Sequence, residues 1–175
     1  MSLGLSFPVV MCPQGYYCGE GTLTLDPADP SPLRPVACQE GVFCLGGVSS
    51  PDVIDWIPTQ TYGQSKAQPC SQGTFCKEGA FMSSGSGLCF SGHYCPPLQS
   101  FPLVTPIGNF AKERGGVAPT LCFPGSYAPL ESQVDCLTCP SGHTCVSYGT
   151  YKPAICPAGT FRSQVDSVTC RSCDT

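Results

Sequence analysis

The chain has 175 residues, of which 15 are cysteine, 20 are glycine and 19 are proline. Glycine is conformationally free and proline has no backbone N–H, so this composition disfavours helices and long strands. It favours several small modules over one globular domain, each too short to bury a self-sufficient core. Charged residues make up 11% of the chain and the net charge is −4. The eight Lys and Arg residues are scattered, which excludes the basic stripe that nucleic-acid binding requires.

Residues 1–11 form an apolar lead-in segment. It lacks a basic n-region, contains Pro8 and has no small-residue cleavage site, so it is a poor signal peptide. The chain contains no run of about 18 apolar residues, and we expect no membrane span. These features suggest a piece of a longer extracellular protein.

Cysteine at this density indicates either disulfides or zinc. Zinc sites often use two Cys-x-x-Cys pairs that converge on one metal. Only Cys136/Cys139 and Cys170/Cys173 have this spacing, and most cysteines instead form pairs with five residues between them, which suits short covalent loops. We therefore predict disulfides, no metal or other cofactor, and an oxidising compartment.

A seven-residue motif recurs along the chain, and we number its positions 1 to 7. Cysteine occupies position 1 in seven copies, at Cys12, Cys38, Cys70, Cys89, Cys122, Cys139 and Cys156. Position 4 is glycine in all seven copies, and position 6 is aromatic in six, with Thr144 as the exception. Glycine supplies the positive φ that a sharp turn needs. The aromatic side chain is expected either to lie over the disulfide, as most of a small core, or to continue a short strand.

The motif closes in two ways. Five copies have a second cysteine at position 7, whereas in the copies that open at Cys122 and Cys156 thirteen residues separate the two cysteines. We predict the disulfides Cys12–Cys18, Cys38–Cys44, Cys70–Cys76, Cys89–Cys95, Cys122–Cys136, Cys139–Cys145 and Cys156–Cys170. A crossed scheme, in which the second cysteine of one copy pairs with the first of the next, is the main alternative. Cys173 is left unpaired within this chain and opens a truncated copy.

The motif divides the chain into repeats. After the lead-in 1–11 we expect repeats at 12–37, 38–69, 70–88, 89–121, 122–138 (long form), 139–155 and 156–172 (long form), and the start of an eighth at 173–175. The longest spacers, 46–69 and 96–121, contain large apolar residues and are expected to form short strands. Trp56 is interpreted as a packing anchor, with a partner contact as the alternative.

Other candidate chemistry is weaker. His93 and His143 both occupy position 5, and we interpret them as surface residues on a turn. The acidic residues Asp26, Asp29, Asp52 and Asp55 do not have the spacing of a calcium loop and are interpreted as solvated turn residues.

Catalysis is not expected. The Cys-x-x-Cys pairs lack the βαβ context of a redox motif. The chain also offers no Ser–His–Asp arrangement and no glycine-rich phosphate loop. We predict that the chain is not an enzyme.

The long copies, Cys122-Phe-Pro-Gly-Ser-Tyr with Cys136-Leu-Thr-Cys139 and Cys156-Pro-Ala-Gly-Thr-Phe with Cys170-Arg-Ser-Cys173, resemble the ephrin-receptor-like cysteine-rich repeat. In outline they are also similar to the first module of tumour-necrosis-factor receptors. The short copies, such as Cys12-Pro-Gln-Gly-Tyr-Tyr-Cys18, resemble a compact form found in tandem in flagellar-hair (mastigoneme) and other surface proteins of single-celled eukaryotes.

The resemblance covers about residues 12–173. It implies a small disulfide-rich fold, an elongated tandem array of short cysteine-stapled modules with short β-hairpins, mostly irregular chain and little helix. It implies no enzymatic activity.

Two functions follow as hypotheses. The first is a structural segment of an extracellular polymer, coat or flagellar appendage, which packs at the cell surface against copies of itself or other protein chains. The second is a receptor stalk or ligand-binding ectodomain, and a thiol oxidoreductase is a distant third. The only asparagine, Asn109, is not in an N-glycosylation sequon, which leaves O-linked glycan on Ser, Thr or hydroxylated Pro.

Overall fold

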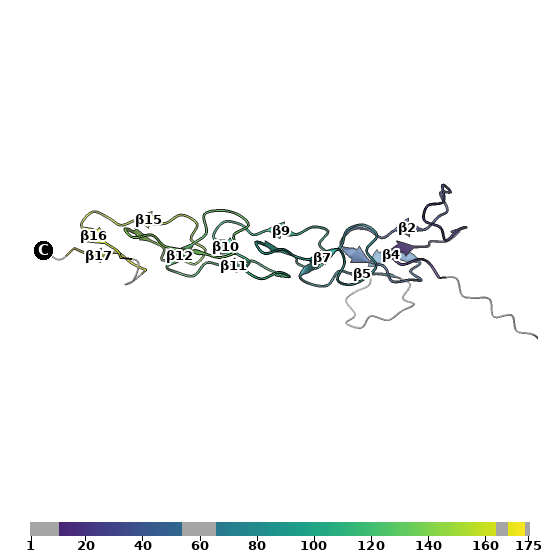
Figure 1. Ribbon diagram of the computed structural model, residues 1–175, viewed down its shortest axis with the longest axis horizontal. Coiled ribbons are helices and arrows are strands. Elements are labelled where there is room, and N and C mark those ends of the chain that lie inside the picture. Colours follow the sequence, from purple (N-terminus) through teal and green to yellow (C-terminus); the bar gives the residue numbers. More distant parts are fainter. Residues whose placement is uncertain (1–10, 54–65, 164–167, 174–175) are drawn as a thin grey trace, which may run out of the picture. The chain divides into compact units, whose positions relative to one another are not determined.

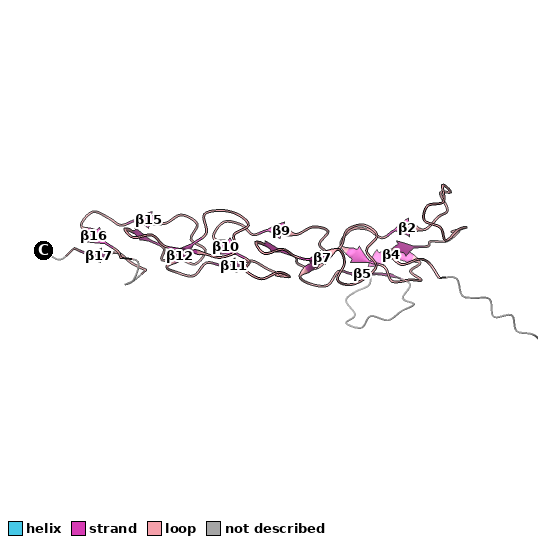
Figure 2. Cartoon of the chain, in the orientation of Figure 1, coloured by secondary structure: helices cyan, strands magenta, loops and turns pink. Residues whose placement is uncertain are grey.

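The computed structural model of the chain describes residues 11–53, 66–163 and 168–173 (Figure 1). These residues form short strands joined by turns and loops, and none of them is helical (Figure 2). Accordingly, no described segment is a helix of membrane-spanning length and hydrophobicity. Trp56 and lead-in residues 1–10 lie outside the described residues.

The strands are mostly two residues long. In chain order they are β1 (Tyr16–Tyr17), β2 (Val36–Ala37), β3 (Val42–Phe43), β4 (Ser50–Val53), β5 (Lys66–Pro69), β6 (Thr74–Phe75), β7 (Gly87–Leu88), β8 (His93–Tyr94), β9 (Leu103–Val104), β10 (Asn109–Phe110), β11 (Thr120–Leu121), β12 (Ser126–Tyr127), β13 (Leu137–Thr138), β14 (His143–Thr144), β15 (Ala154–Ile155), β16 (Thr160–Phe161) and β17 (Arg171–Ser172). Both long spacers contribute strands, as expected from their apolar residues.

Each repeat is one antiparallel hairpin. Positions 5 and 6 of a motif pair with the two residues that precede position 1 of the next motif, so that Ser126 is opposite Thr138 and Tyr127 is opposite Leu137. The eight antiparallel pairs are β1–β2, β3–β5, β6–β7, β8–β9, β10–β11, β12–β13, β14–β15 and β16–β17, and β4 adds to β5 in parallel. A small disulfide-rich fold with tandem short hairpins and little helix is thereby confirmed.

The chain divides into two compact units. Unit 1 comprises Met1–Ser71, Cys76–Ser86 and Leu98–Ser100, and unit 2 comprises Gln72–Phe75, Gly87–Pro97 and Phe101–Thr175. In unit 2 the hairpins from β8–β9 to β16–β17 follow one another in chain order (Figure 1).

The range 89–121, one repeat by its cysteines, contains two hairpins, β8–β9 and β10–β11. The first strand of the second hairpin lies within the sequence Thr105-Pro-Ile-Gly108-Asn-Phe110-Ala111, which has glycine at position 4 and an aromatic residue at position 6 but no cysteine. The array therefore contains a repeat at 105–121 that cysteine spacing alone does not reveal.

Backbone hydrogen bonds join each repeat to the next in the same pattern. The N–H at position 4 donates to the carbonyl at position 7 of the following motif, as in Gly92 to Ala111 (2.7 Å) and Gly108 to Ala128 (2.8 Å). The N–H at position 1 of the following motif donates back to the glycine carbonyl, as in Cys122 to Gly108 (3.0 Å). Since only backbone atoms take part, the cysteine-free repeat joins this ladder like the others.

The glycine at position 4 is fixed by a close approach of the backbone. Gly108 has φ +79°, and a Cβ built on it would lie 2.2 Å from the carbonyl oxygen of Gly149, two repeats further along the chain. Gly92 is placed in the same way, with φ +77° and 2.3 Å to the carbonyl oxygen of Ser132. Positive φ alone disfavours a side chain, and the carbonyl leaves no room for one.

The core consists of small clusters around disulfides. Phe43 packs with Cys70 and Cys76, and Phe75 packs with Cys89 and Cys95. The aromatic residue of one motif thus lies on the disulfide of the next motif, and it also belongs to a strand. Both expectations for position 6 hold at these two residues, and the aromatic contact links neighbouring repeats.

Alanine substitutions at Gly142 and Gly108 distinguish the cost of a positive φ from the cost of the close backbone contact. Gly142 has φ +72° and no described residue comes within 4 Å of a built Cβ, whereas Gly108 has the Gly149 oxygen at 2.2 Å. Gly142→Ala is expected to cost about 1–2 kcal/mol, the penalty of a left-handed conformation. Gly108→Ala is expected to cost about 1–3 kcal/mol more, because the backbone must shift. Thermal unfolding with the disulfides intact measures both, and equal losses in the two variants would contradict the role of the carbonyl contact.

Candidate functional site

Seven disulfides close the motifs. They join Cys12–Cys18, Cys38–Cys44, Cys70–Cys76, Cys89–Cys95, Cys122–Cys136, Cys139–Cys145 and Cys156–Cys170, with Cα–Cα distances between 5.7 and 6.2 Å. Each disulfide lies within one repeat, so no disulfide connects successive repeats. Loops of this length contribute about 2–3 kcal/mol each through the entropy of the unfolded chain.

Cys173 is exposed and forms no disulfide. Its N–H donates to the carbonyl of Gly159 (2.9 Å), which is the bond that position 1 of a following motif makes elsewhere in unit 2. Its backbone therefore has the geometry of an opening cysteine.

In the cysteine-free repeat, Thr105 takes the place of the opening cysteine. Its side chain is fully buried, its hydroxyl donates to the carbonyl of Gly92 (2.9 Å), and its N–H donates to the same oxygen (3.1 Å). Ala111 is buried at position 7. A usable sequence signal was present, because Thr105, Cys122, Cys139, Cys156 and Cys173 follow one another at a constant spacing of seventeen residues.

The long copies also lack cysteine at position 7 and fill it differently. Ala128 is fully buried there, while Arg162 is 6% exposed in the other long copy. The guanidinium Nη1 of Arg162 donates to the carbonyl oxygens of Cys139, Pro140 and His143, at 3.1–3.2 Å. A buried cation is therefore satisfied by backbone oxygens of the preceding repeat.

Two surface patches in unit 2 share the sequence Leu-Cys-Phe. In the first, Leu88 lies against Gly115, and the guanidinium of the adjacent Arg114 lies 5.9 Å from the ring centre of Phe90. We call Leu88, Phe90 and Arg114 the Leu88 patch.

The second patch has the same construction. Leu121 lies against Gly149, and the ring of the adjacent Tyr148 meets that of Phe123 edge to face at 5.6 Å. We call Leu121, Phe123 and Tyr148 the Leu121 patch. Its two rings are 59% and 61% exposed, so large apolar side chains pack on one another outside the core.

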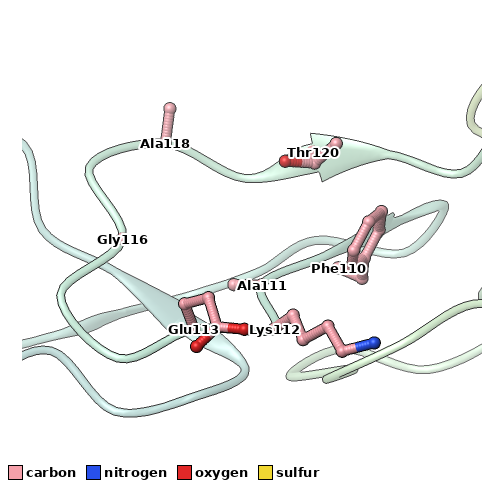
Figure 3. Close-up of a pocket in the computed structure, with 7 residues that line it drawn as sticks. All are labelled: Phe110, Ala111, Lys112, Glu113, Gly116, Ala118 and Thr120. Carbon is pink, nitrogen blue, oxygen red and sulfur yellow. The ribbon is translucent and has the colours of Figure 1, made fainter.

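The loop after Phe110 borders a cavity of about 190 Å³, lined by Phe110, Ala111, Lys112, Glu113, Gly116, Ala118 and Thr120 (Figure 3). The ammonium group of Lys112 points away from the carboxylate of Glu113 and bonds Asp135 at 3.0 Å. Most of the lining is apolar or backbone, so the cavity offers few groups for recognising a ligand.

The Lys112–Asp135 pair is exposed on both sides. The hydrogen bond from Lys112, followed by that from the Cys136 N–H, lowers the pKa of Asp135, and Asp135 raises the pKa of Lys112. The Asp135 contribution is present above its unfolded pKa and is lost as pH falls through the lowered value. Solvent screening keeps this contribution small.

The two histidines lie apart, in the hairpins β8–β9 and β14–β15. His93 Nδ1 lies 3.3 Å from the carbonyl oxygen of Ser91, and His143 Nδ1 lies 3.1 Å from that of Ser141. A carbonyl only accepts, so each contact needs the proton on Nδ1. Both rings are thus tied to their own turn.

The acidic candidates are local turn residues where the structure describes their side chains. The Asp26 carboxylate accepts the N–H of Ala28 and that of Asp29 accepts the N–H of Ser31. Asp52 lies in strand β4 and not in a turn, so that prediction was wrong, and Asp55 lies outside the described residues. Within the described ranges no group of three His, Cys, Asp or Glu side chains is placed to hold a metal ion.

The two cysteines of each Cys-x-x-Cys pair are not bonded to each other. Cys136 pairs with Cys122 and Cys139 pairs with Cys145, while Cys170 pairs with Cys156. Each spacing therefore marks the end of one motif and the start of the next.

No protein-family model matches the chain, and no curated protein matches it. The likeness to the ephrin-receptor-like repeat therefore depends on the motif residues alone.

Peptide mapping without reduction is expected to recover the disulfides Cys122–Cys136 and Cys139–Cys145, because their Cα atoms are 5.8 and 6.0 Å apart. Cys173 is expected to react with an alkylating agent before any reduction. A Cys136–Cys139 linkage would contradict this connectivity and would revive the oxidoreductase hypothesis.

Arg162→Met is expected to destabilise the chain by about 1–3 kcal/mol, since the carbonyls of Cys139, Pro140 and His143 lose this donor. Arg162→Lys retains a charged donor and should recover part of the loss. Thermal unfolding with intact disulfides measures both variants. If Met and Lys behave alike, packing of the side chain and not the hydrogen bonds explains the burial of Arg162.

Proposed function

We propose that the chain is a structural segment of an extracellular, cysteine-rich repeat protein that packs with neighbouring chains into a filament, coat or flagellar appendage. The proposal assigns it no catalytic activity. Classification with ephrin-receptor-like repeats is part of the same proposal and is supported by the motif residues.

The observation that carries the proposal is the exposure of large apolar side chains in unit 2. Besides the two patches, Val104 and Ile155, each directly before position 1 of the following motif, are 48% and 76% exposed. Disulfides and backbone hydrogen bonds hold the fold, so these side chains are not needed for its core. Apolar surface of this kind favours burial against a protein neighbour.

The charge of the chain supports side-by-side packing. Only 11% of its residues are charged, and the net charge is −4. Chains with few charges approach one another with little electrostatic repulsion, and few ions lose their water when the surfaces meet.

The disulfides support an extracellular location. Seven intramolecular disulfides persist in an oxidising environment and would be reduced in most cytosols. Short closed loops also resist extension and proteolysis, which suits a filament or coat. O-linked glycan on exposed Ser and Thr is compatible with this location.

The test is self-association of the chain with its disulfides intact, followed by sedimentation over a concentration series and by electron microscopy. Phe123→Ser/Tyr148→Ser removes the exposed rings of the Leu121 patch. We expect at least a tenfold weaker association, equivalent to about 1.4 kcal/mol. The folded chain should lose less than about 1.5 kcal/mol, since only one ring pair is removed.

Leu23→Ser is the matched control, because Leu23 is 78% exposed but lies in the loop between β1 and β2 and belongs to neither patch. It should leave association unchanged. A wild-type chain that stays monomeric at every concentration would contradict self-packing. If the control and the double variant weaken self-association equally, the Leu121 patch is not the contact through which the chains pack.

A further inference from the structure

The repeat 105–121 is the one described repeat of unit 2 whose hairpin has no disulfide of its own. Residues 96–121 lie between Cys95 and Cys122, which belong to two separate disulfides. Only non-covalent contacts therefore hold the turn at positions 1–7 of this repeat, which a disulfide closes in the short copies of the motif.

Most of these contacts are backbone hydrogen bonds to the neighbouring repeats. The Thr105 hydroxyl donates to Gly92 O, the Ala111 N–H donates to Gln133 O (3.0 Å), and the exposed Lys112–Asp135 pair is the side-chain link to the following repeat. Hydrogen bonds of this kind break and re-form during local unfolding, whereas a disulfide does not. Within unit 2 we therefore expect this repeat, which no disulfide closes, to open most easily.

The same repeat presents a basic residue on its surface. Arg114 is exposed at the end of the run Lys112-Glu113-Arg114 and is followed by Gly115. A trypsin-like serine protease binds an arginine side chain through a carboxylate in its specificity pocket. The bond that follows Arg114 therefore has the chemistry that such a protease recognises.

The Arg114–Gly115 bond is protected while the hairpin is closed. The Gly115 N–H donates to the carbonyl oxygen of Cys89 (2.9 Å). The carbonyl oxygen of Gly115 packs against Gly73, 2.2 Å from the position that a Cβ on Gly73 would have. A protease needs an extended segment around the scissile bond. Cleavage therefore requires that residues around Gly115 leave the ladder first.

We propose that the repeat Thr105–Leu121 is a proteolytic processing site, at which a trypsin-like protease cuts the Arg114–Gly115 bond after local opening of hairpin β10–β11. The C–N bond breaks, water supplies hydroxyl to the Arg114 carbonyl carbon, and a proton goes to the new amino group of Gly115. The proposal goes beyond the structural role and does not depend on assembly.

The disulfide pattern determines what cleavage produces. The bonds Cys12–Cys18 to Cys89–Cys95 lie before Arg114, and the bonds Cys122–Cys136 to Cys156–Cys170 lie after it. No described disulfide spans the cut. The products are two fragments that keep their own disulfides and are not covalently joined.

The experiment is limited trypsin digestion of the full chain with its disulfides intact, read by non-reducing gel and mass spectrometry. The first cut is expected at Arg114–Gly115. Lys77–Glu78 is the internal reference, since Lys77 is also exposed but directly follows Cys76 of a closed disulfide. Faster cleavage at Lys77 than at Arg114 would overturn the proposal.

Thr105→Cys/Ala111→Cys places a cysteine pair at positions 1 and 7 of the open repeat. Once its new disulfide is verified, cleavage at Arg114 should slow at least about tenfold, with no change at Lys77. An unchanged rate at Arg114 would overturn the role of the missing disulfide.

Thr105→Val carries the test if the cysteine pair does not form. It removes the hydroxyl donor to Gly92 with little change in volume, and cleavage at Arg114 should quicken about fivefold. The amide of Gly115 should exchange with deuterium faster in the same variant. No change in either rate would count against opening through this hairpin.

Fragments ending at Arg114 and beginning at Gly115 should be present in extracellular material from the native source. If that material contains only the intact chain, although trypsin cuts the isolated chain rapidly, the processing role is overturned.

Discussion

The array depends on one backbone contact, in which the position 4 glycine receives the carbonyl oxygen of a residue two repeats further on. At Gly73, Gly92 and Gly108 this oxygen lies 2.2–2.3 Å from where a Cβ would be. The same glycines donate their N–H to the next repeat and accept an N–H through their carbonyl. A side chain at Gly73, Gly92 or Gly108 would break several of these contacts together, and the positive φ shared by the position 4 glycines disfavours a side chain in the other copies.

The ladder, and not the disulfide, defines a repeat. Thr105 and Ala111, Ala128, and Arg162 replace cysteines at buried positions while the hydrogen-bond pattern stays the same. The disulfides add covalent closure to a unit that backbone geometry already specifies. Small modules need this help because they bury little apolar surface.

A fold held in this way leaves its large side chains free. Aromatic residues such as Phe43 and Phe75 pack on disulfides, but the Leu88 and Leu121 patches face outward. An apolar surface and a nearly neutral chain suit packing with neighbours. The disulfides are unevenly distributed along unit 2, because the repeat at Thr105 contains none, and on this ground we proposed that it opens before the others.

The sequence determined the fold class, since the cysteine density and the glycine at position 4 predict short disulfide-stapled hairpins. It also contained the period of seventeen residues that includes Thr105, but a count based on cysteine could not detect a copy that has none. Only the tertiary structure showed which residues of different repeats contact one another. Gly108 approaches Gly149, and Arg162 bonds three carbonyls of the preceding repeat, although these residues are far apart in sequence. For the same reason only the structure separated the patch of Leu121, Phe123 and Tyr148 from the core: the exposure of a side chain depends on what the neighbouring repeats place beside it.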